Sequence, residues 1–412
     1  MVFDVAVVGA GPTGCMAAYT AARLGLKTIL IEEDKSVGRP LHCTGKLTAR
    51  AFEEFNLPRE IILNSVRGAY FYSPNNTLLT VSRRDAESHI INRESLDRWL
   101  AEKAVDARAE LLTGKKCLEV TGRGGLKNLR LWGGGGLVEV TARLVVDAEG
   151  ANPTLLKSVD VERVRAFVEG LQYEVEGAGY ERDDYVEVYF GNRFAPGFFG
   201  WIVPLGGGKA RVGLCVGEKA PYPSRRYLDN FIKEHPVVSE KLRGAKVSNR
   251  YGGWIPLHGP ISRTYGEGLL IVGDAAGHTK STSGGGVYFG LKAAQLAGVT
   301  LAECVETGDY SQRGLRRYEE RWRATFGREI RFTSAVRRFL DDLSDGELDS
   351  LFRLLSTDEK FVKNAEIHGD TAYQSRLLKP TILTATKLAL KNPSKLSLLL
   401  KFAVKGLQSI LR

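Results

Sequence analysis

The sequence predicts an α/β fold in which a parallel-sheet domain is interrupted by a mixed β-sheet domain and followed by a helical C-terminal region. Residues 3–32 run from a buried strand through a glycine turn and an alanine-rich helix to a second strand, as parallel α/β sheets begin. Short strands with interleaved aromatic residues follow later, and the α/β pattern then returns. These observations predict a discontinuous first domain at 1–165 and 265–330, a β-rich domain at 166–264 and a helical region at 331–412.

Each element of the first domain has a local signal. Runs of apolar residues predict strands, helical spacing of apolar residues predicts helices, and glycine pairs mark the turns between them. Gly133 to Gly136 predicts a hairpin turn, because no strand-to-helix transition surrounds it. The expected strands are 3–8, 28–31, 144–147 and 269–272, and the expected helices are 15–22, 93–109 and 287–305.

Composition limits the class of protein. With 412 residues, 43% hydrophobic and 26% charged, the chain is a globular protein of two or three domains rather than a disordered or coiled-coil one. Glycine is in excess, at 46 residues. Lysines interrupt every long apolar stretch, so we expect neither a signal peptide nor a transmembrane helix. The five cysteines are widely spaced without a CxxC pair, which indicates reduced thiols in a cytoplasmic protein and no metal site.

Positive charge is concentrated in the C-terminal tail. The net charge is +10, yet residues 371–412 hold eight basic residues and no acidic one, so the rest is nearly neutral. On helical spacing most apolar residues of 396–411 share one face and the basic residues oppose it, whereas Leu398 and Phe402 break the pattern. This pattern predicts peripheral association with an anionic membrane surface, and its alternative is a solvated helix packed on the domain. Nucleic acid is not expected as a partner, because no basic groove accompanies the tail.

A dinucleotide fingerprint follows the first strand. Gly9, Gly11 and Gly14 fit GxGxxG, in which the glycines permit the tight turn, the approach of a pyrophosphate and helix packing. The helix N-terminus that follows offers N–H donors and partial positive charge to phosphate. Glu32 ends the second strand, where an acidic residue binds a ribose hydroxyl. The first domain is therefore predicted to be Rossmann-like and to bind a dinucleotide.

A second fingerprint indicates that this dinucleotide is FAD. Residues 269–277 form a strand followed by a Gly-Asp turn, and they resemble the second FAD motif of hydroxylase-like flavoproteins, whose Asp contacts the ribityl chain; here it is Asp274. Gly284, Gly285 and Gly286 open the next helix, where backbone N–H groups could face the flavin. A third motif of that group ends in Asp-Gly, whereas this chain has Glu149 before its glycine.

Residues 196–204, PGFFGWIVP, resemble the PxxYxWxFP signature of geranylgeranyl reductases, flavoenzymes that saturate isoprenoid double bonds in archaeal lipids and chlorophyll side chains. Trp201 matches, whereas Phe199 replaces the Tyr and so lacks its phenol. The resemblance implies that Cys43 lies near the flavin, that Arg93 contacts FAD, and that Phe199 and Trp201 line the alkene site. Taken alone, these aromatic residues also fit an ordinary core, and Cys43 also fits a buried small residue.

The resemblance implies an FAD-dependent reductase acting on CH–CH bonds, in which hydride from reduced flavin N5 saturates geranylgeranyl chains of a membrane-lipid precursor or a prenyl diphosphate. The implied electron donor is a ferredoxin-type carrier or NADPH, because no second nucleotide-binding loop is visible. Two alternatives share the FAD motifs: a monooxygenase or halogenase, and a flavoprotein that binds lipid without catalysis.

Overall fold

The computed structural model describes residues 1–122, 125–157 and 161–377. The chain forms two compact units, each assembled from three separate stretches. The first comprises Met1–Leu41, Arg93–Ala166 and Ile255–Arg331, and the second comprises His42–Asn92, Phe167–Trp254 and Phe332–Arg412. The predicted helix of the basic tail falls on 378–412 and lies outside the described residues.

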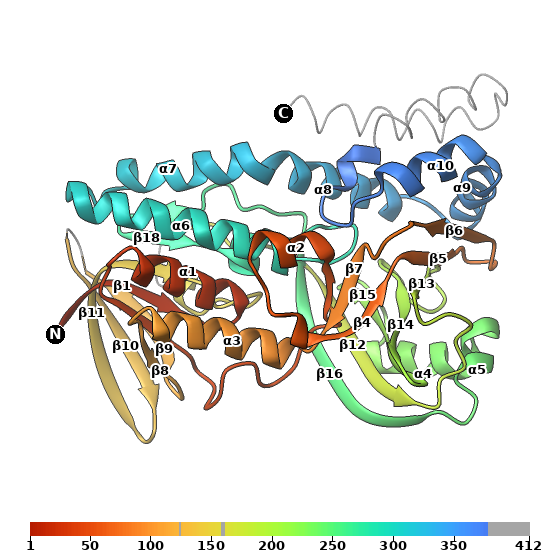
Figure 1. The fold of residues 1–412 in the computed structure, drawn as a ribbon, viewed down its shortest axis with the longest axis horizontal. Helices are drawn as coiled ribbons and strands as arrows, with labels where there is room; N and C mark the ends of the chain where they lie inside the picture. The colour runs from red at the N-terminus through yellow and green to blue at the C-terminus, as the bar shows by residue number, and fades with distance from the viewer. Residues whose placement is uncertain (123–124, 158–160, 378–412) are drawn as a thin grey trace. The chain divides into compact units, whose positions relative to one another are not determined.

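The first unit is built on an eight-stranded sheet (Figure 1). Six of its strands follow the order β17-β18-β11-β1-β2-β8, and the other two are β10, which pairs with β11, and β9, which pairs with β10. The central pairs β11-β1 and β1-β2 are parallel, as the buried apolar runs predict. The predicted hairpin at Gly133 and Gly136 is confirmed, because these two glycines pair across β10 and β11. The strands are β1 (Val2–Val8), β2 (Thr28–Ile31), β8 (Glu110–Leu112), β9 (Lys116–Thr121), β10 (Lys127–Gly133), β11 (Gly136–Asp147), β17 (Tyr265–Gly266) and β18 (Leu269–Ile271).

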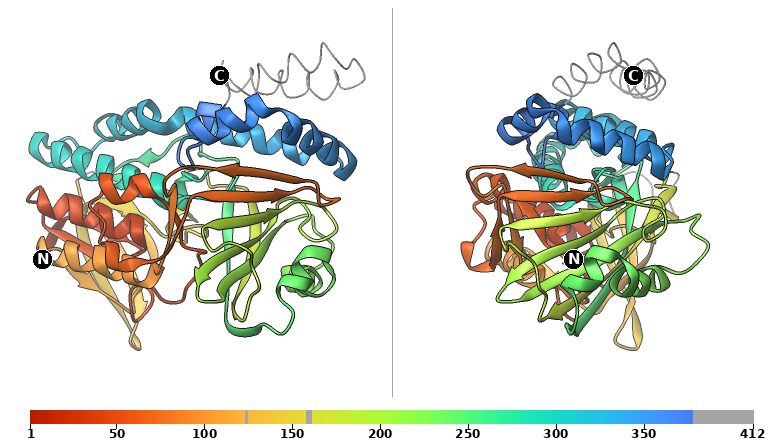
Figure 2. Two further views of the ribbon diagram at one scale, coloured as in Figure 1. Left: turned by 45° about the vertical axis from the view of Figure 1, so that its right-hand side comes forward. Right: turned by 90° about the vertical axis from the view of Figure 1, so that its right-hand side faces the viewer.

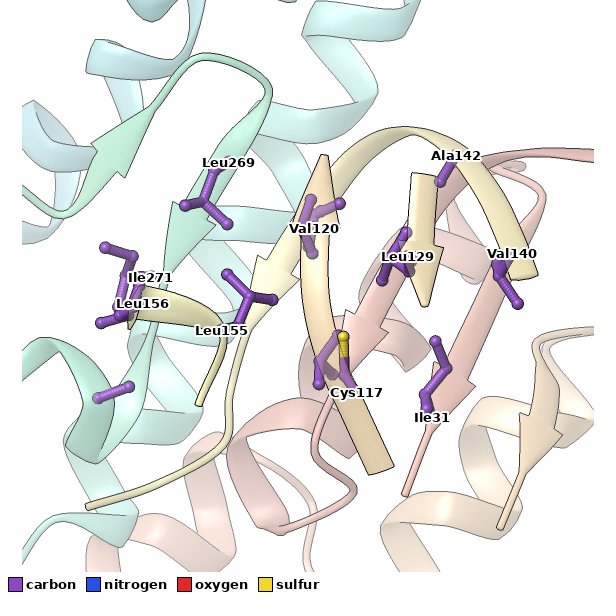
Figure 3. Packing of buried hydrophobic residues seen from close by; sticks show 14 of the residues in the cluster. Ile31, Cys117, Val120, Leu129, Val140, Ala142, Leu155, Leu156, Leu269 and Ile271 are labelled. Carbon is purple, nitrogen blue, oxygen red and sulfur yellow. The ribbon is translucent and has the colours of Figure 1, made fainter. Parts of the chain in front are cut away.

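Helices with small residues lie beside this sheet. Helix α1 (Pro12–Arg23) packs between α3 (Arg93–Asp106) and α6 (Val287–Thr307), and α6 also contacts α7 (Gln312–Trp322) (Figure 1). The helix pair α1 and α6 approaches closely at Gly298, where a Cβ would stand 2.6 Å from Thr20. On the sheet, buried apolar side chains such as Ile31, Leu129 and Ile271 form one continuous core (Figure 3). The predicted helices are thus confirmed.

The second unit contains a seven-stranded sheet with the order β16-β12-β15-β14-β13-β5-β6. Strands β13 and β14 of this sheet are drawn in yellow-green in Figure 2. One face packs on α4 (Ser224–Glu234) and α5 (Pro236–Lys241), with Ile202, Leu214 and Phe231 in the shared core. The strands are β5 (Gly68–Tyr72), β6 (Leu78–Ser82), β12 (Ala166–Glu176), β13 (Tyr185–Tyr189), β14 (Gly200–Gly206), β15 (Lys209–Gly217) and β16 (Lys246–Leu257).

Residues 42–92 cluster with this second unit, whereas the sequence-based boundaries place them in the first domain. The physical reason is strand pairing: β5 pairs in parallel with β13 and so extends the second sheet. The same stretch supplies helix α2 (Ala49–Glu54) and a three-stranded sheet of β3 (Lys46–Thr48), β7 (Ser88–Ile91) and β4 (Ile62–Val66).

Helices end the described chain, as the sequence predicts. They are α8 (Arg328–Asp341), which begins in the first unit, α9 (Asp345–Thr357) and α10 (Glu359–His368). Within the second unit, Phe339, Phe352 and Phe361 from these helices bury against Leu79 of β6. The α/β class with a helical C-terminal region is therefore confirmed.

Candidate functional site

The glycine turn after β1 is a tight crossing of backbone. Gly9 has φ +99°, and a Cβ there would stand 2.4 Å from the carbonyl oxygen of Ala148. A Cβ on Gly14 would stand 1.8 Å from the carbonyl oxygen of Gly9. Both positions therefore require glycine for the fold itself, because a side chain would push the turn away from the sheet.

Gly11 differs, because a Cβ built there meets no atom within 4 Å. It is the N-cap of α1, Pro12 begins the helix, and no side chain caps the first turn. Free N–H groups at a helix start, next to open space, form a cradle for phosphate. This turn fits the pyrophosphate of a dinucleotide.

Glu32 borders this cradle at the end of β2. Its Oε2 accepts a hydrogen bond of 2.6 Å from the N–H of Ala10, and its Oε1 accepts one of 3.0 Å from the N–H of Asp34. Burial raises the pKa of the Glu32 carboxyl, and these two bonds act in the opposite direction. The carboxylate is therefore fixed beside the glycine turn, where an acid binds a ribose hydroxyl.

The second predicted motif meets the first one at Thr13. A Cβ on Gly273 would stand 2.9 Å from Thr13 Oγ1, and a Cβ on Gly290 of α6 would stand 2.3 Å from the same atom. The turn after β18, the start of α6 and the start of α1 therefore converge in the first unit. The sequence separates these segments by more than 250 residues, so the structure brings the two FAD motifs together.

Asp274 lies half-buried in this second turn. Burial raises the pKa of its carboxyl, and the charge of Arg93 opposes that rise. Arg93 begins α3 and pairs with Asp97, with 3.0 Å between Nη2 and Oδ2. A Cβ on Gly286 would stand 2.5 Å from Asp274 Oδ1, so the carboxylate lies against the start of α6.

The glycines before α6 shape a second uncapped helix start. Gly284 has φ +69°, Gly286 is the N-cap of α6, and no side chain caps this helix. Gly285 forms an isolated bridge with Lys280. The first unit therefore holds all nine predicted cofactor residues, and two helix starts without side-chain caps are available to an anionic or polar ligand.

Glu149 has a partner that the sequence did not reveal. Its Oε2 accepts a hydrogen bond of 2.7 Å from the N–H of Leu155, and its own N–H donates to Asp147 Oδ1 at 3.0 Å. Burial raises the pKa of Glu149 to about 7 and that of Asp147 well above its usual range. The longer side chain of Glu thus holds the loop that follows β11.

Histidines do not form a metal site in the described residues. His42 is exposed, whereas His278 is fully buried between Trp322 and Phe326, and burial lowers its pKa to about 3. The described part of the chain contains no group of His, Cys, Asp and Glu that could hold a metal ion. It also contains no helix long and apolar enough to cross a bilayer.

Four aromatic side chains of the second unit, Phe190, Phe198, Phe199 and Trp201, form what we call the aromatic wall. Phe198 and Phe199 stack at 4.4 Å between ring centroids, and Trp201 meets Phe199 edge-on at 6.1 Å. Phe190 joins Phe199 at 5.7 Å. Phe198 is buried, whereas Phe199 and Trp201 are only partly buried. The wall is therefore a partly buried apolar surface, and it carries no phenol at position 199.

Cys43 lies in a loop of the second unit that polar side chains hold. It is the only one of the five cysteines that is not buried, and its Sγ accepts a hydrogen bond of 3.3 Å from the N–H of Gly45. Arg211 Nη1 donates to the carbonyl oxygen of Thr44 at 2.7 Å, and Thr44 Oγ1 donates to Gln172 Oε1 at 2.9 Å. The sequence did not predict Arg211 and Gln172 as part of the site, because a polar residue on a strand is usually interpreted as facing solvent.

Two family models and a known relative match this chain. A family model described as FAD dependent oxidoreductase matches residues 4–185, and one described as geranylgeranyl reductase catalytic domain matches residues 167–252. Digeranylgeranylglycerophospholipid reductase 2 of Methanothermobacter thermautotrophicus is 34% identical over 86% of this chain and 92% of its own length.

Solved structures agree on the fold. A geranylgeranyl bacteriochlorophyll reductase-like protein from Thermoplasma acidophilum superposes with a TM-score of 0.85 at 25% identity, covering 96% of this chain and 99% of that one. A flavin-dependent brominase superposes with a TM-score of 0.70 at 16% identity, covering 92% and 98%, and this shows the shared fold alone.

A Rossmann-like domain with an uncapped helix start at its glycine turn, an acid at the end of β2 and a half-buried Asp at the second turn is typical of an FAD-dependent oxidoreductase. FAD is its cofactor, and the residues of the first unit fit it. The chain belongs to the digeranylgeranylglycerophospholipid reductase branch of the geranylgeranyl reductase family.

Proposed function

We propose that this protein saturates carbon–carbon double bonds in the geranylgeranyl chains of a glycerophospholipid precursor. One observation carries the proposal: the catalytic-domain match at residues 167–252 spans the strand that carries Trp201 and the residues before it. The name of the relative that is 34% identical supports the glycerophospholipid substrate over a prenyl diphosphate. FAD, when bound and reduced, supplies the hydride.

The chain's own residues bind the dinucleotide and position the substrate. Gly11 and the start of α1 hold the dinucleotide phosphates, while Glu32 and Asp274 accept hydrogen bonds from its sugar-type hydroxyls. An isolated alkene has no carbonyl for an enzyme to polarise, so catalysis depends on placing the double bond and on keeping water away. We assign the exclusion of water to the aromatic wall and place Cys43 on the flavin side of the substrate. Phe199 has no proton to give, so the proton comes from another group.

The decisive experiment is anaerobic incubation of the dithionite-reduced protein with geranylgeranyl glycerophospholipid, followed by mass spectrometry. Saturation predicts products heavier by about 2 mass units per bond reduced, with reoxidation of the flavin spectrum. Incorporation of oxygen under air instead of hydrogen would favour the monooxygenase alternative. Lipid binding without any change of mass would favour the non-catalytic alternative.

Two partners complete the proposal. A ferredoxin-type carrier or NADPH reduces the flavin, and stopped-flow reduction with each donor identifies which one. The basic tail at 371–412 attaches the protein to anionic membranes. Co-sedimentation of the full chain with anionic vesicles, but not with neutral ones, is the expected result, and equal recovery with both would exclude the electrostatic attachment.

A further inference from the structure

A row of side chains crosses the face of the second sheet opposite α4. Gln172 of β12 pairs with Gly213 of β15, Gly213 pairs with Trp201 of β14, and Val188 and Phe71 continue the row. The row lies on one face, because residues directly opposite each other on adjacent strands point to the same side. It therefore joins Gln172 to the aromatic wall.

Gly213 lets the two larger side chains close over it. A Cβ at Gly213 would stand 2.5 Å from Cβ of Gln172 and 2.6 Å from Cζ2 of Trp201. In indole, Cζ2 is bonded to the carbon that carries Nε1. The edge of Trp201 that carries the N–H group is therefore the edge lying over Gly213, next to the strand of Gln172.

Both side chains have a buried donor without an acceptor among the described residues. Gln172 is 4% exposed, its Oε1 is occupied by the hydroxyl of Thr44, and its Nε2 has no partner. Trp201 Nε1 is likewise buried and without a partner. Buried donors in proteins nearly always have acceptors, so two neighbouring exceptions in an apolar surface indicate an acceptor that arrives with a ligand.

The surroundings select an uncharged acceptor. Arg211 lies on the same face, two residues along β15, and Glu174 lies 3.3 Å from its Nε. Arg337, whose guanidinium lies 5.5 Å from the ring centroid of Phe198, is paired with Asp341 at 2.6 Å. Nη1 of Arg211 is already bonded to the carbonyl oxygens of Thr44 and Ile91. A phosphate at the donor pair would therefore lose its hydration without meeting a free positive charge, whereas a neutral oxygen needs only the two N–H groups.

We propose that Trp201 Nε1 and Gln172 Nε2 form a donor pair that binds one uncharged oxygen within the hydrocarbon-binding surface. The oxygen is either the one that joins a prenyl chain to glycerol or a water molecule that enters with the chain. This inference rests on the proposed prenyl-lipid substrate. A hydrogen bond to this donor pair fixes the position of the prenyl chain along the aromatic wall.

Indole NMR tests the donor pair directly. The chain has five tryptophans, so protein labelled with 15N at the indoles gives five N–H signals, and Trp201→Phe identifies that of Trp201. Two probes are added in turn: geranylgeranyl glycerol ether and a hydrocarbon of the same chain without oxygen. A downfield shift of the Trp201 proton with the ether alone supports the glycerol-linked oxygen. The same shift with both probes, with a nuclear Overhauser contact to water, supports the water.

Affinity measurements complete the test. Gln172→Met should weaken binding of the ether about three- to tenfold, the loss of one hydrogen bond, and leave the hydrocarbon unchanged if the oxygen is the ligand's. With a bound water, the variant weakens both probes and abolishes the water contact. Trp254→Phe, at an exposed position, is the matched control and should change neither. An unshifted Trp201 signal while both probes bind would overturn the donor pair alone. Binding of neither probe would overturn the proposed function and, with it, this inference.

Discussion

The guanidinium of Arg211 donates a hydrogen bond of 2.7 Å to the carbonyl oxygen of Thr44, the residue next to Cys43. The same nitrogen donates to the carbonyl oxygen of Ile91 at 3.3 Å. A Cβ on Gly45 would stand 2.7 Å from that nitrogen, so the loop and the arginine are in close contact. One buried side chain of β15 thus holds the loop that carries the partly buried thiol of Cys43.

Arg211→Met should release this loop. The variant leaves two carbonyl oxygens without their donor and Glu174 without its cation, so we expect a loss of about 3–5 kcal/mol in the free energy of unfolding. Alkylation by iodoacetamide should be faster at Cys43, and it reports this loop because the other four cysteines are buried. Lys209→Met, on the same strand with an exposed ion pair to Glu176, is the control and should alter neither quantity. An unchanged alkylation rate in Arg211→Met would show that the loop is held by other contacts.

Glu149 should make stability depend on pH. Its pKa in the folded protein is about 7, above the ordinary value of 4.5, so the folded state favours the protonated carboxyl. The contribution of this group to stability is therefore fully present below pH 4.5 and is lost as the pH rises through 7, by about 3 kcal/mol. Glu149→Gln should reduce the fall seen when urea unfolding is compared at pH 5 and pH 8, and the part that remains belongs to Asp147, whose pKa burial also raises. Glu53→Gln, at an exposed position, should retain the whole fall. Equal pH dependence in wild type and Glu149→Gln would contradict the assignment.

Two glycines of one turn should respond differently to alanine. Gly14→Ala places a Cβ against the carbonyl oxygen of Gly9, so the apoprotein should lose about 3 kcal/mol of stability. Gly11→Ala meets open space and has a φ of −67°, so the apoprotein should unfold as wild type does. FAD affinity should nevertheless fall at least about tenfold in Gly11→Ala, because the methyl group enters the phosphate cradle. Thermal unfolding and flavin fluorescence titration separate the two effects. Wild-type FAD affinity in Gly11→Ala would place the pyrophosphate elsewhere.

Local patterns predicted the first unit well, because its signals lie within a few residues of one another. The turn at Gly9, the hairpin at Gly133 and the helix start at Gly286 each follow from glycine placement beside an apolar run. Long-range pairing could not be predicted in this way. The parallel register of β5 with β13 joins residues more than 110 positions apart, and no local pattern specifies it.

The contacts between side chains of distant strands could not be predicted from the sequence either. Gln172 and Arg211 follow the ordinary alternation of a strand, and only the cross-strand register shows that they lie against Trp201 and the Cys43 loop. The Glu149 contact with Leu155 depends on a loop conformation that the sequence does not encode in any recognisable motif. The candidate site was therefore predictable where backbone conformation demands glycine, and not where polar side chains meet across strands.

Arg93 offers a test that separates stability from cofactor binding. It pairs with buried Asp97, and its charge also opposes the rise in the pKa of half-buried Asp274. Arg93→Met leaves both carboxyls without this cation, so we expect a loss of about 3–5 kcal/mol at pH 8 and a smaller loss at pH 5, where they can take up protons. Adding Asp97→Leu should restore much of the stability, because an apolar pair replaces a buried ion pair well.

FAD affinity should remain low in this double variant if Arg93 serves the cofactor as well as the fold. Flavin titration of the two variants at equal stability is the measurement, with Arg98→Met as a control on the exposed side of the same helix. Recovery of FAD binding together with stability would mean that Arg93 acts only through the fold. Its position at the start of α3, next to a carboxylate that the cofactor motif supplies, leads us to expect the opposite.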